Sequence, residues 1–389
     1  MQQKTTYSIL WAIAIAHLFN DLIQAVIPAV YPQLQKEFNL SMAQIGRITL
    51  CYQIAASVFQ PLVGFITDKH PMPFSQIGGM LFSFVGIILL SFAPSYEWIL
   101  VAVIVVGIGS SIFHPESSRV AYLASGGKRS MAQSVFQLGG NAGTAIAPLL
   151  IVWIIIPNHR SYIAWFGIIV LLAKILLYYV GKWRTRELKN QKNKHTKTIV
   201  LPNLTQKQIF TSIFILLLLI FSKYFYTVSI TNYFQFYLIE THHFSETTAQ
   251  LYLFYFLIAS AFGTLLGGIF GDRIGRKFVI WFSILGVAPL SLLLPYLPTA
   301  YIAICIVFIG LIISSAFPAI LVYAQELLPH KIGMISGLFY GLAFGMAGIA
   351  AAVLGNFIDQ TSITYVYQVC SYLPLIGLVA YFLPNLKNI

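Results

Sequence analysis

The sequence predicts an all-α membrane protein with twelve transmembrane helices, arranged as two pseudo-symmetric halves of six. Composition is the first reason: of 389 residues, 58% are hydrophobic and 9% are charged, whereas a soluble domain carries roughly 25% charged residues. A bilayer accepts such a chain as helices of about 20 apolar residues, because each helix satisfies its own backbone hydrogen bonds. The spacing of the apolar runs and an internal repeat are the second and third reasons.

Twelve apolar runs of membrane-spanning length are bounded by charges, turns or polar clusters. Six lie in the first half of the chain: Ile9–Tyr31, Gln44–Ile66, Phe74–Ala93, Trp98–Ala124, Ala132–Ile155 and Tyr162–Val180. Six lie in the second half: Phe210–Ile239, Ala249–Phe270, Phe278–Leu294, Ala300–Tyr323, Gly333–Phe357 and Tyr365–Leu383. The first run is too long for a signal-peptide core and has no small-residue cleavage site, so we expect a retained helix.

The two halves share a repeated pattern. Gly64, Asp68 and Lys69 lie at and just after the end of the second run, and the matching residues Gly268, Asp272 and Arg273 lie at and just after the end of the eighth. Further along, SSIF (110–113) recurs as SSAF (314–317). We therefore predict six-helix halves at 1–181 and 208–389, joined by a basic linker at 182–207 that either binds anionic lipid or only connects the halves.

Positive charge predicts the orientation of the chain in the membrane. An even number of spans places both termini on one side, and the loops on that side hold most of the lysine and arginine: Lys69, Lys128, Arg129, Arg273, Arg276, Lys277, Lys331 and the linker. The other loops hold little beyond Lys36, Arg47 and Arg160. By the positive-inside rule, both termini should be cytoplasmic.

Several function classes are not supported. The net charge of +12 is spread over short loops rather than over one face, so we expect no nucleic-acid partner. Cys51, Cys305 and Cys370 lie inside apolar runs without metal-ligand spacing, so neither a disulfide framework nor a zinc site is implied. No HExxH motif or phosphate loop occurs, so we expect no enzyme and no cofactor.

The first span contains a polar stripe in AHLFNDLIQAVIP (16–28). His17, Asp21 and Gln24 fall at i, i+4 and i+7 on one helix face, with Asn20 at its edge. One interpretation is structural, a stripe that fixes one helix against another. The other is functional: burial and a nearby cation shift the pKa of a carboxyl group in opposite directions, so its charge can change with conformation.

The fourth span contains FHPESSRVAYLASGG (113–127). Pro115 should kink or loosen this helix, and Glu116 and Arg119 are spaced to pair on one face. A structural interpretation joins this pair with Asp68 in a cytoplasmic ion-pair lock. A functional interpretation makes His114 and Glu116 proton carriers, and for His114 both interpretations remain open.

The turn GGIFGDRIGRK (267–277) is expected to join two closely packed helices at the cytoplasmic face. Gly268 lets two helices approach closely, Asp272 can accept from backbone amides, and Arg273 and Arg276 anchor the cytoplasmic face. Glu326 at the end of the tenth span is expected to pair with one of these arginines. Gly64 and Asp68 are the counterparts in the first half.

Polar side chains in two other spans are candidates for substrate contact. Lys223 lies among apolar residues, where a central lysine costs about 2.5–3.5 kcal/mol unless it snorkels or faces a polar cavity. The residues near it favour a cavity wall for an anionic or amphipathic solute: Tyr224, Tyr226, Asn232 and Tyr233. The fifth span, QLGGNAGTAIAP (137–148), is explained by close helix packing, with Asn141 as its one polar candidate.

Together with GDRIGRK, the stretches FNDLIQAVIPAVYPQLQKEF, SSIFHPESSRVAYLASGG, FSKYFY and AILVYAQELLP resemble transporters of the major facilitator superfamily over nearly the whole chain. The resemblance implies a proton-driven efflux pump of the bacterial inner membrane that exports a small phosphonate antibiotic and other small drugs, as a monomer in the lipid bilayer.

The same resemblance implies that the first, fourth, seventh and tenth helices line one cavity. On this basis Asp21 is the expected coupling carboxylate, tuned by His17, His114 and Lys223, while Asn20 and Gln24 join the substrate contacts. The alternative is an importer or facilitator of a natural phosphonate, sugar phosphate or organic anion with the same fold.

Overall fold

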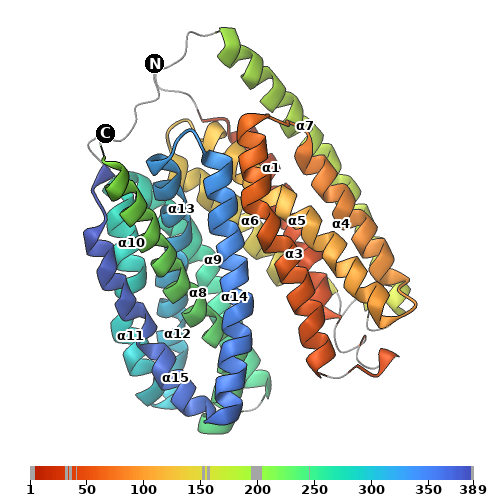
Figure 1. Cartoon of the computed structure of the whole chain (residues 1–389). Helices are drawn as coiled ribbons and strands as arrows, with labels where there is room; N and C mark the ends of the chain where they lie inside the picture. Colours follow the sequence, from red (N-terminus) through yellow and green to blue (C-terminus); the bar gives the residue numbers. More distant parts are fainter. Residues whose placement is uncertain are drawn as a thin grey trace. The chain divides into compact units, whose positions relative to one another are not determined.

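The computed structural model describes residues 5–30, 34, 37–40, 42–150, 154–155, 158–193, 204–244 and 246–386. These residues form helices and connecting turns, and no strand occurs among them (Figure 1). The predicted all-α membrane fold is therefore confirmed.

The helices of the first half follow the six predicted spans. In chain order they are α1 (Tyr7–Ala29), α3 (Met42–Lys69), α4 (Ser75–Ser91), α5 (Tyr96–Ala124), α6 (Arg129–Leu150), the 3₁₀ helix η2 (Arg160–Trp165) and α7 (Phe166–Asn193). Helix α5 passes through Pro115 without a break. Helix α7 continues to Asn193, so the first part of the predicted linker is helical, and 194–203 lies outside the described residues.

The second half contains more breaks than the sequence indicated. Its helices are α8 (Gln206–His242), α9 (Glu246–Ile274), α10 (Arg276–Leu285), α11 (Ala288–Leu293), η3 (Leu294–Tyr296), α12 (Thr299–Ser314), α13 (Ala316–Leu327), α14 (Ile332–Gln360), α15 (Ile363–Ser371) and the 3₁₀ helix η4 (Leu373–Phe382). The ninth, tenth and twelfth predicted spans each correspond to consecutive helical segments rather than to one helix.

Proline explains the break in the tenth span. Pro318 has no N–H, so the carbonyl of Ser314 loses its partner four residues ahead. Thr264 Oγ1 on α9 donates to the Ser260 carbonyl at 2.9 Å and shares its hydrogen with the Ser314 carbonyl at 3.4 Å. The Ser314 carbonyl therefore keeps a weak donor from a neighbouring helix at the break between α12 and α13.

Ten segments of the described chain are long and apolar enough to cross a membrane, and Ser75–Ser91 is a shorter apolar helix. Helix α6 is absent from both sets because its sequence is rich in glycine, serine and polar residues. Its small residues serve packing: a Cβ on Gly139 or Gly143 would collide with the backbone of Ala14 or Leu18 on α1. The packing interpretation of the fifth span is thus supported.

The chain divides into two compact units. Unit 1 comprises Met1–Val200 and Leu328–Phe344, and unit 2 comprises Leu201–Leu327 and Gly345–Ile389. The start of α14 therefore packs with the first half of the sequence, which the sequence did not indicate. The division at 182–207 remains our prediction for the domain boundary.

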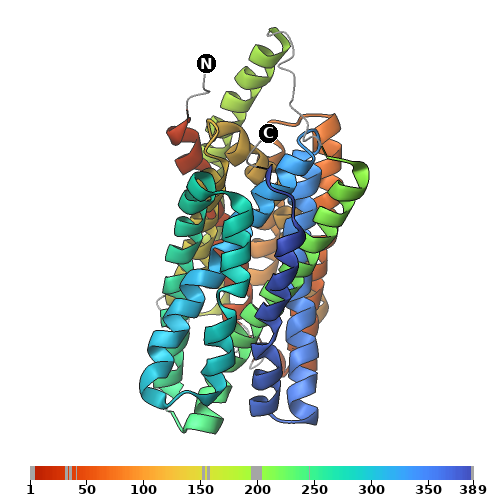
Figure 2. The same ribbon diagram turned by 90° about the vertical axis from the view of Figure 1, so that its left-hand side faces the viewer.

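Each unit has its own core. In unit 1 the most extensive helix contacts are those of α1 with α6 and of α5 with α3 and α4. In unit 2, buried aromatic and aliphatic side chains of α8, α9, α12 and α15 pack together, among them Phe234, Phe256, Ile306 and Tyr367. Figure 2 shows that the helices of unit 2 run side by side over most of their length.

Candidate functional site

Three titratable side chains from two helices meet inside unit 1. His17 and Asp21 lie one turn apart on α1, and His114 comes from α5. His17 Nε2 is 3.1 Å from Asp21 Oδ2, and His114 Nε2 is 3.5 Å from Asp21 Oδ1. Both histidines are fully buried, and the Asp21 side chain is 14% exposed. The structure therefore joins the three residues predicted for proton coupling in one cluster.

Backbone carbonyls determine which nitrogen of each imidazole carries hydrogen. His17 Nδ1 lies 2.7 Å from the Phe136 carbonyl oxygen, and His114 Nδ1 lies 3.0 Å from the Ser110 carbonyl oxygen. A carbonyl oxygen only accepts, so each Nδ1 must donate. In a neutral imidazole the lone pair then belongs to Nε2, the atom that faces Asp21.

This arrangement brings acceptors together without enough donors. When both imidazoles are neutral in these tautomers, neither Nε2 atom has a hydrogen to donate to the Asp21 oxygen beside it. Two lone pairs and a carboxylate converge in a buried space, where their mutual repulsion is strong unless a positive charge is added. A proton on an imidazole or on the carboxyl group removes the conflict, so the geometry is suited to taking up cationic charge.

Polar neighbours hold Asp21 in place. Asn20 Nδ2 donates to Asp21 Oδ1 at 2.9 Å, and Gln24 Nε2 approaches the same oxygen at 3.5 Å. Tyr52 on α3 donates its hydroxyl hydrogen to Gln24 Oε1. Asn20 and Gln24 were predicted to contact substrate. In the structure, both side chains contact the Asp21 carboxylate directly.

Aromatic rings cover the histidines. Phe136 stacks on His17 with ring centroids 4.0 Å apart. Tyr340 and Phe344, from the part of α14 that belongs to unit 1, lie 5.3 and 5.1 Å from the His114 ring. Such walls lower the local polarity and strengthen the electrostatic interactions inside the cluster.

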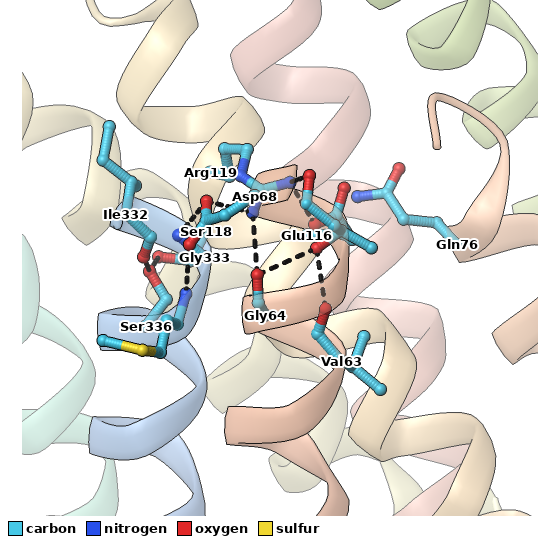
Figure 3. Close-up of polar contacts among 12 residues, drawn as sticks. Val63, Gly64, Asp68, Gln76, Glu116, Ser118, Arg119, Ile332, Gly333 and Ser336 are labelled. Atoms are coloured by element: carbon cyan, nitrogen blue, oxygen red, sulfur yellow. Dashed lines mark hydrogen bonds and ion pairs between the residues drawn. The ribbon is translucent and has the colours of Figure 1, made fainter. Parts of the chain in front are cut away.

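A second network surrounds Arg119 in unit 1 (Figure 3). Its guanidinium donates to Glu116 Oε1 at 2.6 Å and to Asp68 Oδ1 at 2.5 Å. It also donates to the carbonyl oxygens of Thr67 at 3.0 Å and Gly64 at 3.2 Å. The predicted pairing of Arg119 with Glu116 and Asp68 is therefore present.

Asp68 also caps the beginning of α14. Its Oδ1 accepts from the Gly333 amide at 3.0 Å and its Oδ2 from the Met334 amide at 2.8 Å (Figure 3). The first amides of a helix have no partner within the helix, and a carboxylate also interacts favourably with the helix dipole. Gly64 and Gly333 allow the close approach, because a Cβ on Gly64 would collide with the Gly333 carbonyl.

Unit 2 contains a smaller network of the same kind. Arg276 lies 3.3 Å from Asp272 Oδ1 and 3.3 Å from Glu326 Oε1. The predicted pairing of Glu326 with an arginine of this loop is therefore present, with Arg276 as the partner. Arg273 is exposed, and Gly268 is buried within α9.

Lys223 is buried in unit 2, with 7% of its surface exposed. Its Nζ lies over the ring of Tyr224, 4.7 Å from the centroid, and over Phe317 at 5.2 Å. No carboxylate pairs with it among the described residues. An aromatic environment stabilises a buried ammonium group only in part.

The other predicted substrate contacts separate by location. Tyr226 is 1% exposed and belongs to the core of unit 2. Tyr233 donates to the Ala351 carbonyl at 2.5 Å and so fastens α8 to α14 within that unit. Asn141 is half-buried on α6, and the side chain of Asn232 lies outside the described ones.

Sequence reasoning missed several participants. Tyr52, Gly140 and Tyr340 surround the cluster, and Gly333 and Met334 supply the amides for Asp68. For Gly140, the glycine-rich composition of the fifth span was the only signal in the sequence. The contacts of α14 had no local signal, because they depend on the packing of distant segments.

Comparisons with known proteins agree with this architecture. The family model of the Major Facilitator Superfamily matches residues 13–352 and, in a second match, 225–387. The chain is 52% identical over 385 residues to the fosmidomycin resistance protein of Escherichia coli (strain K12), covering 99% of this chain and 95% of that protein. It is 43% identical to the uncharacterized MFS-type transporter YfnC of Bacillus subtilis (strain 168), with 98% and 94% covered.

A solved structure of the proton:xylose symporter XylE has a TM-score of 0.76 at 15% sequence identity, covering 100% of this chain and 98% of that one, so it supports the fold alone. The chain therefore belongs to the major facilitator superfamily, and it is a multi-pass membrane transporter.

Proposed function

We propose that this transporter is a proton-coupled antiporter that exports fosmidomycin-like phosphonate antibiotics and other small drugs. The observation that carries the proposal is the buried cluster of His17, Asp21 and His114, which needs added positive charge to be stable. The 52% identical relative named for fosmidomycin resistance supports the substrate class.

The cluster supplies the proton site of this mechanism. A proton that enters from outside reduces the electrostatic repulsion at Asp21. Its departure to the cytoplasm restores the repulsion among the three side chains. Because the charge state and the helix packing around Asp21 depend on each other, protonation favours one conformation over another. Asp21 is the carrier, and His17 and His114 adjust its proton affinity.

An anionic drug is bound by the remaining polar groups. Lys223 offers a buried cation without a carboxylate partner among the described residues, and Tyr224 supplies an aromatic surface beside it. A phosphonate carries negative charge, which a buried ammonium group stabilises. In the proposed exchange, drug binding at Lys223 and proton binding at Asp21 favour different conformations of the transporter.

The networks around Arg119 and Arg276 act as gates in this mechanism. Each holds two carboxylates on one guanidinium at the end of transmembrane helices. In the proposed mechanism, these ion pairs are made in one conformation of the transporter and broken in another. We place both networks at the cytoplasmic face of the inner membrane, with both termini in the cytoplasm and the protein acting as a monomer.

Drug accumulation in expressing cells tests the proposal. Cells that express the transporter should retain less fosmidomycin than control cells, and a proton uncoupler should abolish the difference. Export that survives the uncoupler would contradict proton coupling. Higher accumulation and greater drug sensitivity on expression would instead identify an importer of phosphonates, sugar phosphates or organic anions.

A further inference from the structure

We propose that His17, Asp21 and His114 form a binding site for a divalent transition-metal cation, with Zn²⁺ as its representative. No residue pattern in the sequence indicated a metal, because the ligands come from two helices far apart in the chain. The proposal concerns binding by the cluster itself and does not depend on which drug the transporter carries.

The donor set matches known zinc chemistry. Two imidazole nitrogens and one carboxylate are the protein ligands of several zinc sites, which keep a fourth position open. The candidate ligand atoms of the three residues all lie within 4.8 Å of one another. Zinc ligands at about 2.0–2.1 Å in tetrahedral geometry are about 3.4 Å apart. Here His17 Nε2 lies 3.1 Å from Asp21 Oδ2 and His114 Nε2 lies 3.5 Å from Asp21 Oδ1, so each imidazole faces a different oxygen of the carboxylate.

Both imidazoles are already oriented for coordination. A metal-bound histidine donates its other ring N–H to a carbonyl or carboxylate, which fixes the tautomer and directs the free lone pair at the metal. The carbonyls of Phe136 and Ser110 accept from the two Nδ1 atoms in this way. The Nε2 atoms are fully buried, point at Asp21 and, in these tautomers, have no hydrogen to donate to it.

Space beside the ligands is kept by Gly140 on α6. A Cβ at that position would lie 2.5 Å from Asp21 Oδ2 and 2.6 Å from His17 Nε2. Any larger residue would therefore occupy the place next to the two ligand atoms. Glycine leaves that place free for a cation or for its fourth ligand.

The two imidazole ligands indicate which kind of metal the site would bind. Calcium and magnesium prefer sites made of oxygen ligands, whereas imidazole suits zinc, copper, iron and nickel. One carboxylate and two imidazoles therefore favour a transition metal. A dication would also satisfy both lone pairs at once, which a single proton cannot do.

Titration of the purified protein tests the site. The full chain, purified in detergent with its affinity tag removed, is titrated with Zn²⁺ in a calorimeter and with Co²⁺ in a spectrophotometer. We expect one Zn²⁺ per chain, and Co²⁺ should show the visible absorption of a four-coordinate site. His17→Gln and His114→Gln should each weaken Zn²⁺ binding by about tenfold or more.

His243→Asn is the matched control. His243 is exposed and has a φ of 57°, a conformation that asparagine tolerates. It also belongs to the only adjacent pair of histidines in the sequence, so the control removes the obvious surface alternative. Its Zn²⁺ binding should equal that of the unmodified protein.

Three results would overturn the proposal: no Zn²⁺ binding to the unmodified protein, equal binding by the His17→Gln and His114→Gln variants, or loss of binding in His243→Asn. Circular dichroism and melting curves identify variants that fail to fold, and Asp21→Asn provides a further ligand variant. Since the titration uses neither drug nor proton gradient, its failure is distinguishable from a failure of the proposed transport function.

Discussion

The surroundings of Asp21 show how neighbouring groups determine the environment of one side chain. On a lipid-facing helix a carboxylate would be costly, and here it is buried beside two imidazoles and the Asn20 amide. The hydrogen bonds of both imidazoles to backbone carbonyls direct their free nitrogens at it. Removing or crowding any of these side chains should therefore change the total charge of the cluster.

Gly140→Ala tests the need for space in the cluster. Alanine favours a helix over glycine by about 1 kcal/mol, so propensity alone would make the change harmless. The added Cβ would instead lie 2.5 Å from Asp21 Oδ2, so Asp21 or His17 must move. We expect proton-driven drug exchange in proteoliposomes to fall about tenfold or more, equivalent to about 1.4 kcal/mol in the barrier.

Gly78→Ala on α4 is the control for this change. A Cβ there would meet no atom within 4 Å, so exchange should stay at its normal rate. Normal exchange in Gly140→Ala would show that the site does not require the space.

One part of the cluster could be predicted from the sequence, and the other part could not. The spacing of His17 and Asp21 on one helix face was visible, because helix geometry places i and i+4 together. His114 was recognised only as a candidate, since its meeting with Asp21 depends on the packing of α5 against α1. The carbonyl partners of both imidazoles are backbone atoms, which no residue pattern reveals.

At the scale of elements, the beginning of α14 is the clearest departure from expectation. Apolar runs and the positions of proline and glycine sufficed to place most helices, but not the extension of α7 to Asn193 or the breaks in the second half. They did not indicate that 328–344 would cluster with the first half, or that Asp68 would cap α14. The reason is physical: capping joins residues that are distant in sequence, whereas the hydrophobic pattern reports only local structure.

Asp68→Asn should destabilise unit 1. The amide can accept one backbone hydrogen bond, but Arg119 loses one of its two carboxylates. Breaking a buried pair costs about 3–5 kcal/mol, and the remaining Glu116 favours the lower value, about 3 kcal/mol. The melting midpoint in detergent should fall by roughly 5 °C.

Glu97→Gln is the matched control for that loss, because Glu97 is exposed and its only hydrogen bond among those described is to Ser95. Its melting midpoint should not change. If the melting midpoint of Asp68→Asn equals that of Glu97→Gln, the helix cap and the ion pair do not stabilise the fold.

For the whole molecule, the apolar composition predicts spanning helices, and the distribution of lysine and arginine predicts their direction. A green fluorescent protein fused to the C-terminus should therefore fluoresce in bacterial cells, and alkaline phosphatase fused at the same point should be inactive. The opposite pair of results would place the C-terminus outside the cytoplasm and reverse the assignment of the gates.

In the proposed mechanism, Asp21 carries the proton that drives export. Asparagine has nearly the shape of a protonated aspartate, so Asp21→Asn should fold normally and lack only the exchangeable proton. In proteoliposomes with an imposed pH gradient, we predict that this variant moves no more drug than protein-free liposomes, while Glu97→Gln moves drug at the normal rate. Gradient-driven exchange by Asp21→Asn at the normal rate, with a normal pH optimum, would contradict the account.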